Sequence, residues 1–191
     1  MFFSFGGIKV IIIRELRDID MRQAIELKAL CWPEELGGLS NNKINIDKEI
    51  EFWSSWMHEG VENNDVRVLL GAFENEKLLG VTFASFAEID DILERGIELN
   101  GLWVYPEHRN RGISLMLVNR LLSYYKNLGM KQVVIYNFHY SSSNSYYRKY
   151  GATVMRIDNQ LEEKLPVDVF ICNIDEMNKN IMKVLNKYNI I

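Results

Sequence analysis

Residues 102–114 read LWVYPEHRNRGIS, and this stretch decides how the chain folds. The apolar, β-branched run that leads into it over residues 97–104 predicts a strand, and Pro106 then predicts a turn. Leucines at helical spacing predict a helix over residues 112–128, which Gly129 ends. A strand, a tight turn and a helix start therefore follow one another within a short segment.

The expected start of this helix has the properties of an anion-binding site. The first N–H groups of a helix have no partner within it, and the macrodipole makes that end positive. Gly112 would let a phosphate approach the backbone without a Cβ in the way, and Ser114 adds a small hydroxyl side chain. Arg109 and Arg111 add positive charge. The alternative, a solvated surface pair, is less consistent with two arginines that flank a helix start.

Other phosphate-binding and nucleophilic patterns are missing from the sequence. No GxxxxGK[ST] occurs, which argues against a nucleoside triphosphatase, and no GxGxxG follows an early strand, which argues against a dinucleotide-binding fold. The three histidines form no recognisable Ser-His-Asp or Cys-His arrangement, so no activated nucleophile is expected. His139 could act as a local base, although a lone histidine near a strand end is more often structural.

The composition fits one soluble domain over residues 1–191. Apolar residues make up 48% and charged residues 25%, and the net charge of −4 disfavours nonspecific binding to nucleic acid or to an anionic membrane. Cys31 and Cys172 lack metal-ligand spacing, so we expect no metal and two buried thiols in a reducing cytosol. The first five residues make a poor signal peptide, and no apolar run is long enough to span a membrane. We therefore expect a cytoplasmic protein.

The hydrophobic pattern along the chain predicts an α/β domain whose sheet contains both parallel and antiparallel pairs. Asp18 or Asp20 is expected to cap the first helix, and Pro33 and the glycines after it are expected to end that helix. Residues 88–94 are acidic and predict an excursion or a short helix. The other expected elements are a buried strand at 9–14, a helix at 47–59, a hairpin of strands at 66–73 and 78–86, a strand at 131–138, a helix at 143–150, a strand pair at 152–157 and 167–174, and a helix at 176–188.

The ordered set of motifs resembles the GNAT superfamily, the GCN5-related N-acetyltransferases. In that family a strand ends in apolar-x-Val, a Pro-Glu turn follows, and Arg/Gln-x-x-Gly-x-Gly/Ala begins the helix. Here Arg109 and Gly112 match, and Ser114 replaces the last small residue. The hairpin over residues 74–86 resembles the one before this signature, and residues 147–152, YRKYGA, resemble the later Tyr-x-x-x-Gly-Phe element.

The resemblance implies a fold and an activity. The fold is a GNAT-like mixed sheet with central splayed parallel strands, flanked by helices, with a core of about residues 8–174 and a C-terminal helix of about residues 175–191. The activity is N-acyl transfer from acetyl-CoA to a small-molecule or peptide amine, which attacks the thioester directly. An alternative is a non-catalytic acyl-CoA-binding regulatory module, because Ser114 and Tyr140 depart from the family pattern. A homodimer is an open possibility.

The resemblance also implies a cofactor site. In the family, acetyl-CoA lies between the two splayed strands, which here are residues 97–104 and 131–138. The backbone of Trp103 and Val104 would pair with the pantetheine arm. Asn144 is a candidate contact near the position at which the family often has Asn or Ser. The backbone N–H groups that would hold the pyrophosphate are those of Arg109, Asn110, Arg111, Gly112, Ile113 and Ser114.

Two catalytic roles follow from the same resemblance. Tyr147, four residues before Gly151, matches the family tyrosine whose hydroxyl can protonate the departing CoA thiolate. The alternatives are that Tyr147 only packs or that Tyr146 takes this role. Glu98 matches a strand position at which some members hold a catalytic glutamate, and such a residue is costly to bury unless it is paired or functional. The alternative for Glu98 is a surface charge beside Arg95.

Alternation along the strand sets which side chains share a face. Because successive side chains point to opposite faces, Glu98 and Leu102 should share one face, and Leu99 and Trp103 the other. A base at Glu98 would then lie on the face opposite to Trp103.

The acceptor pocket in such proteins is built largely from the first two helices and their loop, here residues 30–59. Aromatic and acidic side chains gather there, as a cationic amine would need. They are Trp32, Trp53, Trp56, Glu34, Glu35, Asp47, Glu49 and Glu51. The alternative is a set of core tryptophans on an amphipathic helix with a solvated acidic face, and it is favoured because such stripes are usually core. The sequence therefore does not name the acceptor.

Overall fold

The computed structural model describes residues 10–36, 44–88, 94–160 and 165–190. The described strands form one seven-stranded mixed sheet in the order β1-β2-β3-β4-β5-β7-β6. The strands are β1 (Ile12–Glu15), β2 (Val68–Glu74), β3 (Lys77–Phe86), β4 (Gly96–Val104), β5 (Gln132–Phe138), β6 (Thr153–Gln160) and β7 (Leu165–Asn173). The helices are α1 (Asp18–Glu35), α2 (Ile46–His58), the 3₁₀ turn η1 (Pro106–His108), α3 (Ile113–Asn127), α4 (Asn144–Lys149) and α5 (Ile174–Lys187). The expected α/β fold with a mixed sheet is confirmed.

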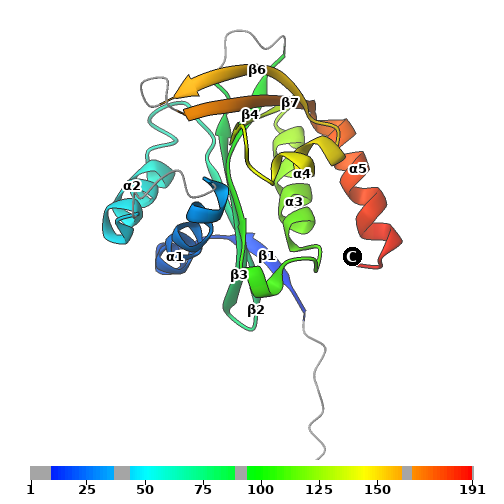
Figure 1. The fold of residues 1–191 in the computed structure, drawn as a ribbon. Helices are drawn as coiled ribbons and strands as arrows, with labels where there is room; N and C mark the ends of the chain where they lie inside the picture. Colours follow the sequence, from blue (N-terminus) through cyan, green and yellow to red (C-terminus); the bar gives the residue numbers. More distant parts are fainter. Residues whose placement is uncertain (1–9, 37–43, 89–93, 161–164, 191) are drawn as a thin grey trace, which may run out of the picture.

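The sheet separates two hydrophobic cores, with α1 and α2 on one face and α3 and α5 on the other (Figure 1). The core under α3 holds Leu117, Leu121 and Tyr125, which are fully buried at the helical spacing that the sequence shows. The core under α1 and α2 contains Trp53 and Phe83, whose ring centroids lie 5.0 Å apart. Each such side chain stabilises the fold by about 1.5–3 kcal/mol through burial, so both faces of the sheet are held firmly.

The two central parallel strands separate along their length. β4 and β5 pair only at their first residues, with Gly96 opposite Gln132 and Glu98 opposite Val134. β4 then continues to Val104 without β5, while β5 stays paired with β7 up to Phe138. The carboxyl-terminal halves of β4 and β5 are therefore splayed, as the resemblance implied.

A β-bulge in β4 changes which side chains share a face. The pairing with β3 shifts between Phe83, opposite Gly101, and Ala84, opposite Leu99, which leaves Asn100 as the extra residue. Leu99 packs in the core under α3, whereas Trp103 packs in the core under α1 and α2. Strict alternation, which placed both on one face, was therefore wrong beyond the bulge.

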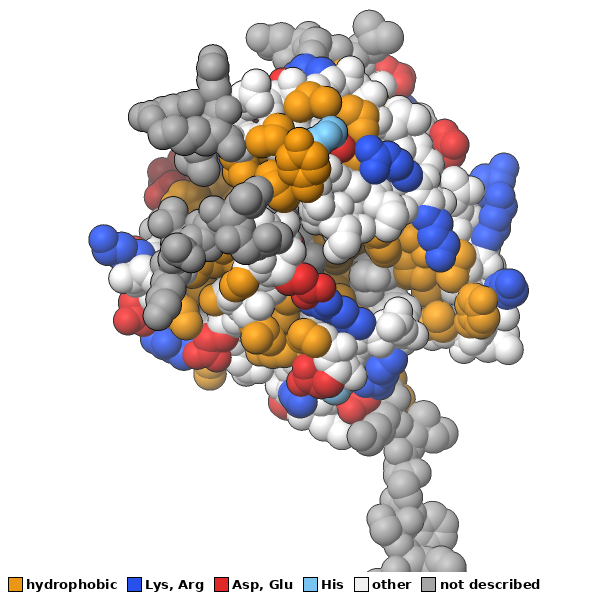
Figure 2. Space-filling model, in the orientation of Figure 1, with side chains coloured by type: hydrophobic (Ala, Val, Ile, Leu, Met, Phe, Trp, Pro, Cys, Tyr) orange, Lys and Arg blue, Asp and Glu red, His pale blue; other side chains and the backbone are white. Residues whose placement is uncertain are grey.

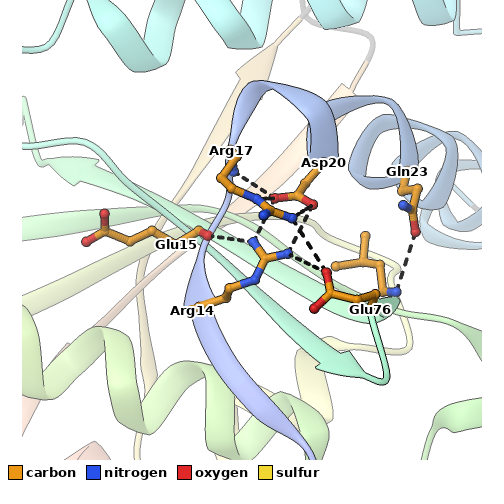
Figure 3. A network of polar contacts seen from close by, with 7 residues as sticks. Arg14, Glu15, Arg17, Asp20, Gln23 and Glu76 are labelled. Carbon is orange, nitrogen blue, oxygen red and sulfur yellow. Dashed lines mark hydrogen bonds and ion pairs between the residues drawn. The ribbon is translucent and has the colours of Figure 1, made fainter.

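The start of α1 is fixed by a buried carboxylate that two arginines share (Figure 3). Asp20 is 4% exposed and accepts hydrogen bonds from Arg14 of β1, at 2.7 Å, and from the Arg17 side chain, at 3.0 Å. Its carboxylate also accepts from the Arg17 backbone N–H, at 2.9 Å, and so completes a capping box in which Arg17 is the N-cap. The expectation that Asp18 or Asp20 is the cap residue was wrong, although Asp20 stabilises this end from within the first turn.

Other differences lie at the ends of elements. Pro33 does not end α1 but lies inside it, so the helix reaches Glu35. β1 is an edge strand rather than a buried one, and Ile12 is 58% exposed. The glycines at 37 and 38 and most of the acidic segment at 88–94 lie outside the described residues. Within the described ranges, no helix is both long and apolar enough to cross a membrane.

Candidate functional site

A cavity of about 740 Å³ opens where β4 and β5 splay. In the view of Figure 2, the surface has a hollow near its middle, and acidic and basic side chains lie next to each other at the rim of this hollow. Nine of the eleven residues that the sequence predicted for the site line this cavity. They are Trp103, Val104, Arg109, Asn110, Arg111, Gly112, Ile113, Ser114 and Tyr147. Glu98 and Asn144 are not among the lining residues.

The start of α3 presents free backbone donors to this cavity. Within the helix, Met116 is the first residue whose N–H is paired, with the Gly112 carbonyl at 3.0 Å. The N–H groups of Ile113, Ser114 and Leu115 have no acceptor among the described residues. Together with the helix dipole, these three donors form a site for an anion such as a phosphate.

Gly112 is needed here for a different reason from the one that the sequence suggested. Its φ of +77° is left-handed, a conformation that glycine adopts without strain. A Cβ at this position would lie 2.6 Å from Cδ1 of Ile190, at the end of the chain beyond α5. The space that glycine leaves open is therefore filled by Ile190 and is not a path for a phosphate.

The two arginines of the signature are both engaged in ion pairs. Arg109 donates to Glu34 of α1 at 2.8 Å and, through Nε, to the Val104 carbonyl at 3.2 Å. Arg111 donates to Glu74 of β2 at 2.9 Å. Both ion pairs lie at the protein surface, so the interpretation as a surface pair stays open beside the binding role. Arg109 also ties the turn after β4 to the end of α1.

Tyr147 lies on α4 with its ring against Phe170 of β7, and the side chain is 8% exposed. Its hydroxyl has no hydrogen-bond partner among the described residues. Burial raises its pKa, and the nearby Tyr146 and Glu35 act in the same direction. A phenol with a raised pKa keeps its proton at neutral pH, so Tyr147 can donate that proton to a leaving group in the cavity.

Tyr146, the neighbouring alternative, also lines the cavity. Its hydroxyl is buried and lies near Ser114, which opposes the rise that burial causes in its pKa. The contact is too poorly formed to count as a hydrogen bond, so the hydroxyl has no partner within the described chain. Both tyrosines therefore carry protons next to the cavity, and the choice of Tyr147 stays a prediction.

Glu35 also lines the cavity, although the sequence gave it no specific role. Its Oε1 accepts a hydrogen bond of 2.7 Å from Nε1 of Trp103. Burial raises the pKa of Glu35 to about 7, against the opposing effects of Trp103, Lys28 and Arg109. The sequence counted Glu35 only among the acidic residues of the acceptor side, because nothing local shows that the end of α1 reaches β4.

Glu98 and Asn144 have other partners in the structure. Glu98 accepts a hydrogen bond of 3.0 Å from Asn100, and burial raises its pKa. The Asn144 amide donates to the carbonyls of Phe138, at 3.1 Å, and His139, at 2.8 Å, and so clamps α4 to the end of β5. A catalytic role for Glu98 and a CoA contact for Asn144 stay predictions, and these bonds count against both.

Trp53 and Trp56 fit the core alternative, whereas Trp32 is half-buried and lies outside that core cluster. Trp53 is 8% exposed and packs on Phe83, and its Nε1 donates to Glu49. Lys28 is buried beside them, with Nζ 2.6 Å from Glu49. This part of the predicted pocket is therefore filled by the protein's own side chains. Elsewhere, His139 pairs with the buried Asp168 at 2.6 Å and does not line the cavity.

Three lining residues come from a part of the chain that carries no motif. Val184 of α5 and, beyond it, Tyr188 and Ile190 form the wall next to the start of α3. Cys31 of α1 lines the cavity as well, with Sγ 3.6 Å from the guanidinium of Arg109. Only tertiary packing brings these residues to the site, so sequence patterns gave no signal for them.

The comparisons with known proteins agree with this geometry. The PaiA N-acetyltransferase of Thermoplasma acidophilum in complex with coenzyme A is 23% identical, with a TM-score of 0.67 over 86% of this chain and 99% of that one. The yncA putative acetyltransferase of Salmonella typhimurium, solved with acetyl-CoA, is 19% identical, with a TM-score of 0.62 over 87% and 95%.

The spermidine N-acetyltransferase of Vibrio cholerae in complex with CoA and spermine is 14% identical, with a TM-score of 0.61 over 87% of this chain and 97% of that one. No curated protein sequence matches the chain. The sequence model of the acetyltransferase (GNAT) family matches residues 22–152. Because this match spans more than half of the chain and the fold agrees, the protein belongs to the acetyltransferase (GNAT) family.

Proposed function

We propose that this protein transfers an acetyl group from acetyl-CoA to a primary amine, which attacks the thioester directly. One observation carries the proposal: the cavity at the β4–β5 splay brings together the free N–H groups at the start of α3 and the protonated Tyr147. The first can bind a pyrophosphate, and the second can protonate a thiolate.

The proposed donor site follows the length of the cavity. The pyrophosphate would accept hydrogen bonds from the N–H groups of Ile113, Ser114 and Leu115, and the pantetheine would lie along Trp103 and Val104. The Val104 carbonyl already accepts from Arg109, so pairing with pantetheine there would use other backbone groups or displace that bond. The solved relatives with coenzyme A or acetyl-CoA support this donor.

The proposed acceptor is a small-molecule or peptide amine. The relative that was solved with spermine supports a small polyamine as one member of a test panel. The lining of the cavity includes the carboxylates of Glu34 and Glu35, which favour a positively charged amine over a neutral or acidic one.

The test uses the full chain, acetyl-CoA and a panel of a polyamine, an aminoglycoside and a peptide with a free N-terminus. Release of free thiol that depends on one amine supports the proposal. Thermal stabilisation by CoA without thiol release from any amine would indicate a binding module that lacks turnover. The absence of both effects would refute the donor site as well as the activity.

A variant locates the donor site. Gly112→Asp places a carboxylate at the start of α3, where it repels a phosphate and also strains the left-handed backbone. We expect CoA binding, measured by calorimetry, to be abolished. Retained affinity in a variant that still folds would place the pyrophosphate elsewhere.

A further inference from the structure

We propose that Glu35 is the general base of this reaction. The inference rests on the proposed acyl transfer and assigns the residue that accepts the proton of the amine. Two observations carry it: Glu35 and Tyr147 line one cavity, and they come from elements on opposite sides of the β4–β5 splay.

The carboxylate of Glu35 is held in place by a single bond. Nε1 of Trp103 donates to Oε1 at 2.7 Å, and Trp103 is itself fixed in the core against Phe83, at a ring distance of 5.6 Å. No described residue donates to Oε2 of Glu35. One oxygen is thus positioned by Trp103, and none of the described residues competes with the amine for the other.

The β4 bulge explains why Trp103 can hold Glu35. Without the extra residue Asn100, Trp103 would point to the α3 side, with Leu99. With the bulge, the Trp103 ring lies under α1 and its N–H faces the last turn of that helix. The bulge in β4 therefore also positions the proposed base.

The nearby cationic side chains form ion pairs with other carboxylates, and no ion pair joins Glu35 to a described residue. Glu34 pairs with Arg109 at 2.8 Å, and Lys28 pairs with Glu49 at 2.6 Å. Burial raises the pKa of Glu35 to about 7, so near neutral pH it can accept a proton and release it again. The titratable or charged groups that face it are Lys28, Cys31 and Glu34 from α1, Arg109 from the turn after β4, and Tyr147 from α4.

The proton transfers balance as follows. The ammonium form of the acceptor gives one proton to Glu35, and its nitrogen lone pair forms a bond to the thioester carbonyl carbon. The C–S bond breaks, its electron pair stays on sulfur, and the sulfur takes the phenolic proton of Tyr147. The second nitrogen proton returns to Tyr147 through solvent, and Glu35 releases its proton to solvent. The products are an amide, free CoA thiol and one proton.

Glu98, the base that the sequence suggested, is the main rival. It does not line the cavity, and one of its oxygens accepts from Asn100. Glu35, by contrast, lines the same cavity as Tyr147.

Glu35→Gln is the decisive variant, because the glutamine carbonyl can still accept the Trp103 bond while the amide cannot accept a proton. We expect kcat/KM at pH 7 to fall by about 100-fold, with CoA affinity by calorimetry unchanged. The wild-type profile of kcat/KM should rise through an apparent pKa of about 7. This rising limb of the pH profile should have the same midpoint for two amine substrates that differ in pKa. It should be absent from the profile of Glu35→Gln.

The controls separate a base from a structural residue. Glu26→Gln, an exposed carboxylate on the same helix, should leave rate and profile unchanged. Glu35→Asp should keep the limb at a reduced rate. A Glu35→Gln enzyme with the wild-type rate and limb, or a limb lost in Glu98→Gln instead, would overturn the assignment. If the wild-type protein releases no thiol with any amine, the proposed function itself fails, which is a distinguishable outcome.

Discussion

Replacement of Gly112 by alanine should destabilise the protein through two separable effects. An alanine held at a φ of +77° costs about 1–2 kcal/mol, because its Cβ crowds the following carbonyl. The new Cβ would also lie 2.6 Å from Cδ1 and 3.1 Å from Cγ2 of Ile190. Displacement of a partly buried methylene or methyl group costs about 0.8 kcal/mol. The sum is about 2–3 kcal/mol, or a fall in Tm of roughly 4–12 °C for a chain of this size.

A double-mutant cycle with Ile190→Ala tests this reasoning. In the Ile190→Ala background the crowding is gone, so Gly112→Ala should cost only the backbone strain, and the coupling between the two sites should be about 1 kcal/mol. Urea denaturation followed by circular dichroism measures all four proteins. An equal cost in both backgrounds would show that Ile190 does not press on this position. Unchanged stability with a loss of CoA affinity would restore the earlier explanation, in which glycine clears a path for a phosphate.

Three further changes probe other parts of the structure. Tyr147→Phe should lower kcat by about 10- to 100-fold with little change in CoA affinity, since it removes a proton donor, and an unchanged rate would exclude this role. Asp20→Asn should destabilise the fold by about 2–3 kcal/mol, because it leaves the Arg14 and Arg17 guanidinium groups without their buried partner. These hydrogen bonds, above all the one from Arg14, lower the pKa of Asp20. Its contribution is therefore complete above about pH 4 and is lost as the pH falls towards the lowered value, and the difference between wild type and variant should shrink in acid denaturation. Tyr125→Phe should cost about 1–3 kcal/mol in chemical denaturation, since the Val66 and Ala84 carbonyls lose their shared donor, and a neutral result would mean that water replaces it.

The sequence was sufficient for the architecture because the deciding features are local. The strand, turn and helix around residues 97–128 each follow from a few neighbouring residues, and the structure places β4, η1 and α3 there. The same holds for the start of α4, whose position brings Tyr147 to the cavity. Local propensity and turn chemistry agree with the fold in these segments, which is why they could be predicted.

The errors arose where one residue acts against the local pattern. Pro33 is a helix breaker, yet α1 continues past it to Glu35, because the last turns of the helix pack against β4 and the turn after it. A bulge at Asn100 is invisible to a rule of strict alternation, and it moved Trp103 to the other face. Both errors concealed the same contact, between Glu35 and Trp103, which depends on two segments far apart in the chain.

The C-terminal segment forms one wall of the cavity, and this could not be inferred either, because it also depends on contacts between distant parts of the chain. Tyr188 and Ile190 follow an amphipathic helix whose pattern shows only that one face is buried. Which surface it covers is decided by its packing on α3, so the contact of Ile190 with Gly112 is a tertiary property.

The separation of β4 from β5 after three residue pairs leaves an unpaired strand edge in the interior of a sheet. At the rim of a protein such an edge would invite other chains to add a strand and aggregate. Here the edge faces the proposed coenzyme site, so under the proposed function the pantetheine arm would complete the ladder in place of a polypeptide strand. The backbone amides along residues 99–104 should then exchange with solvent more slowly when CoA is present.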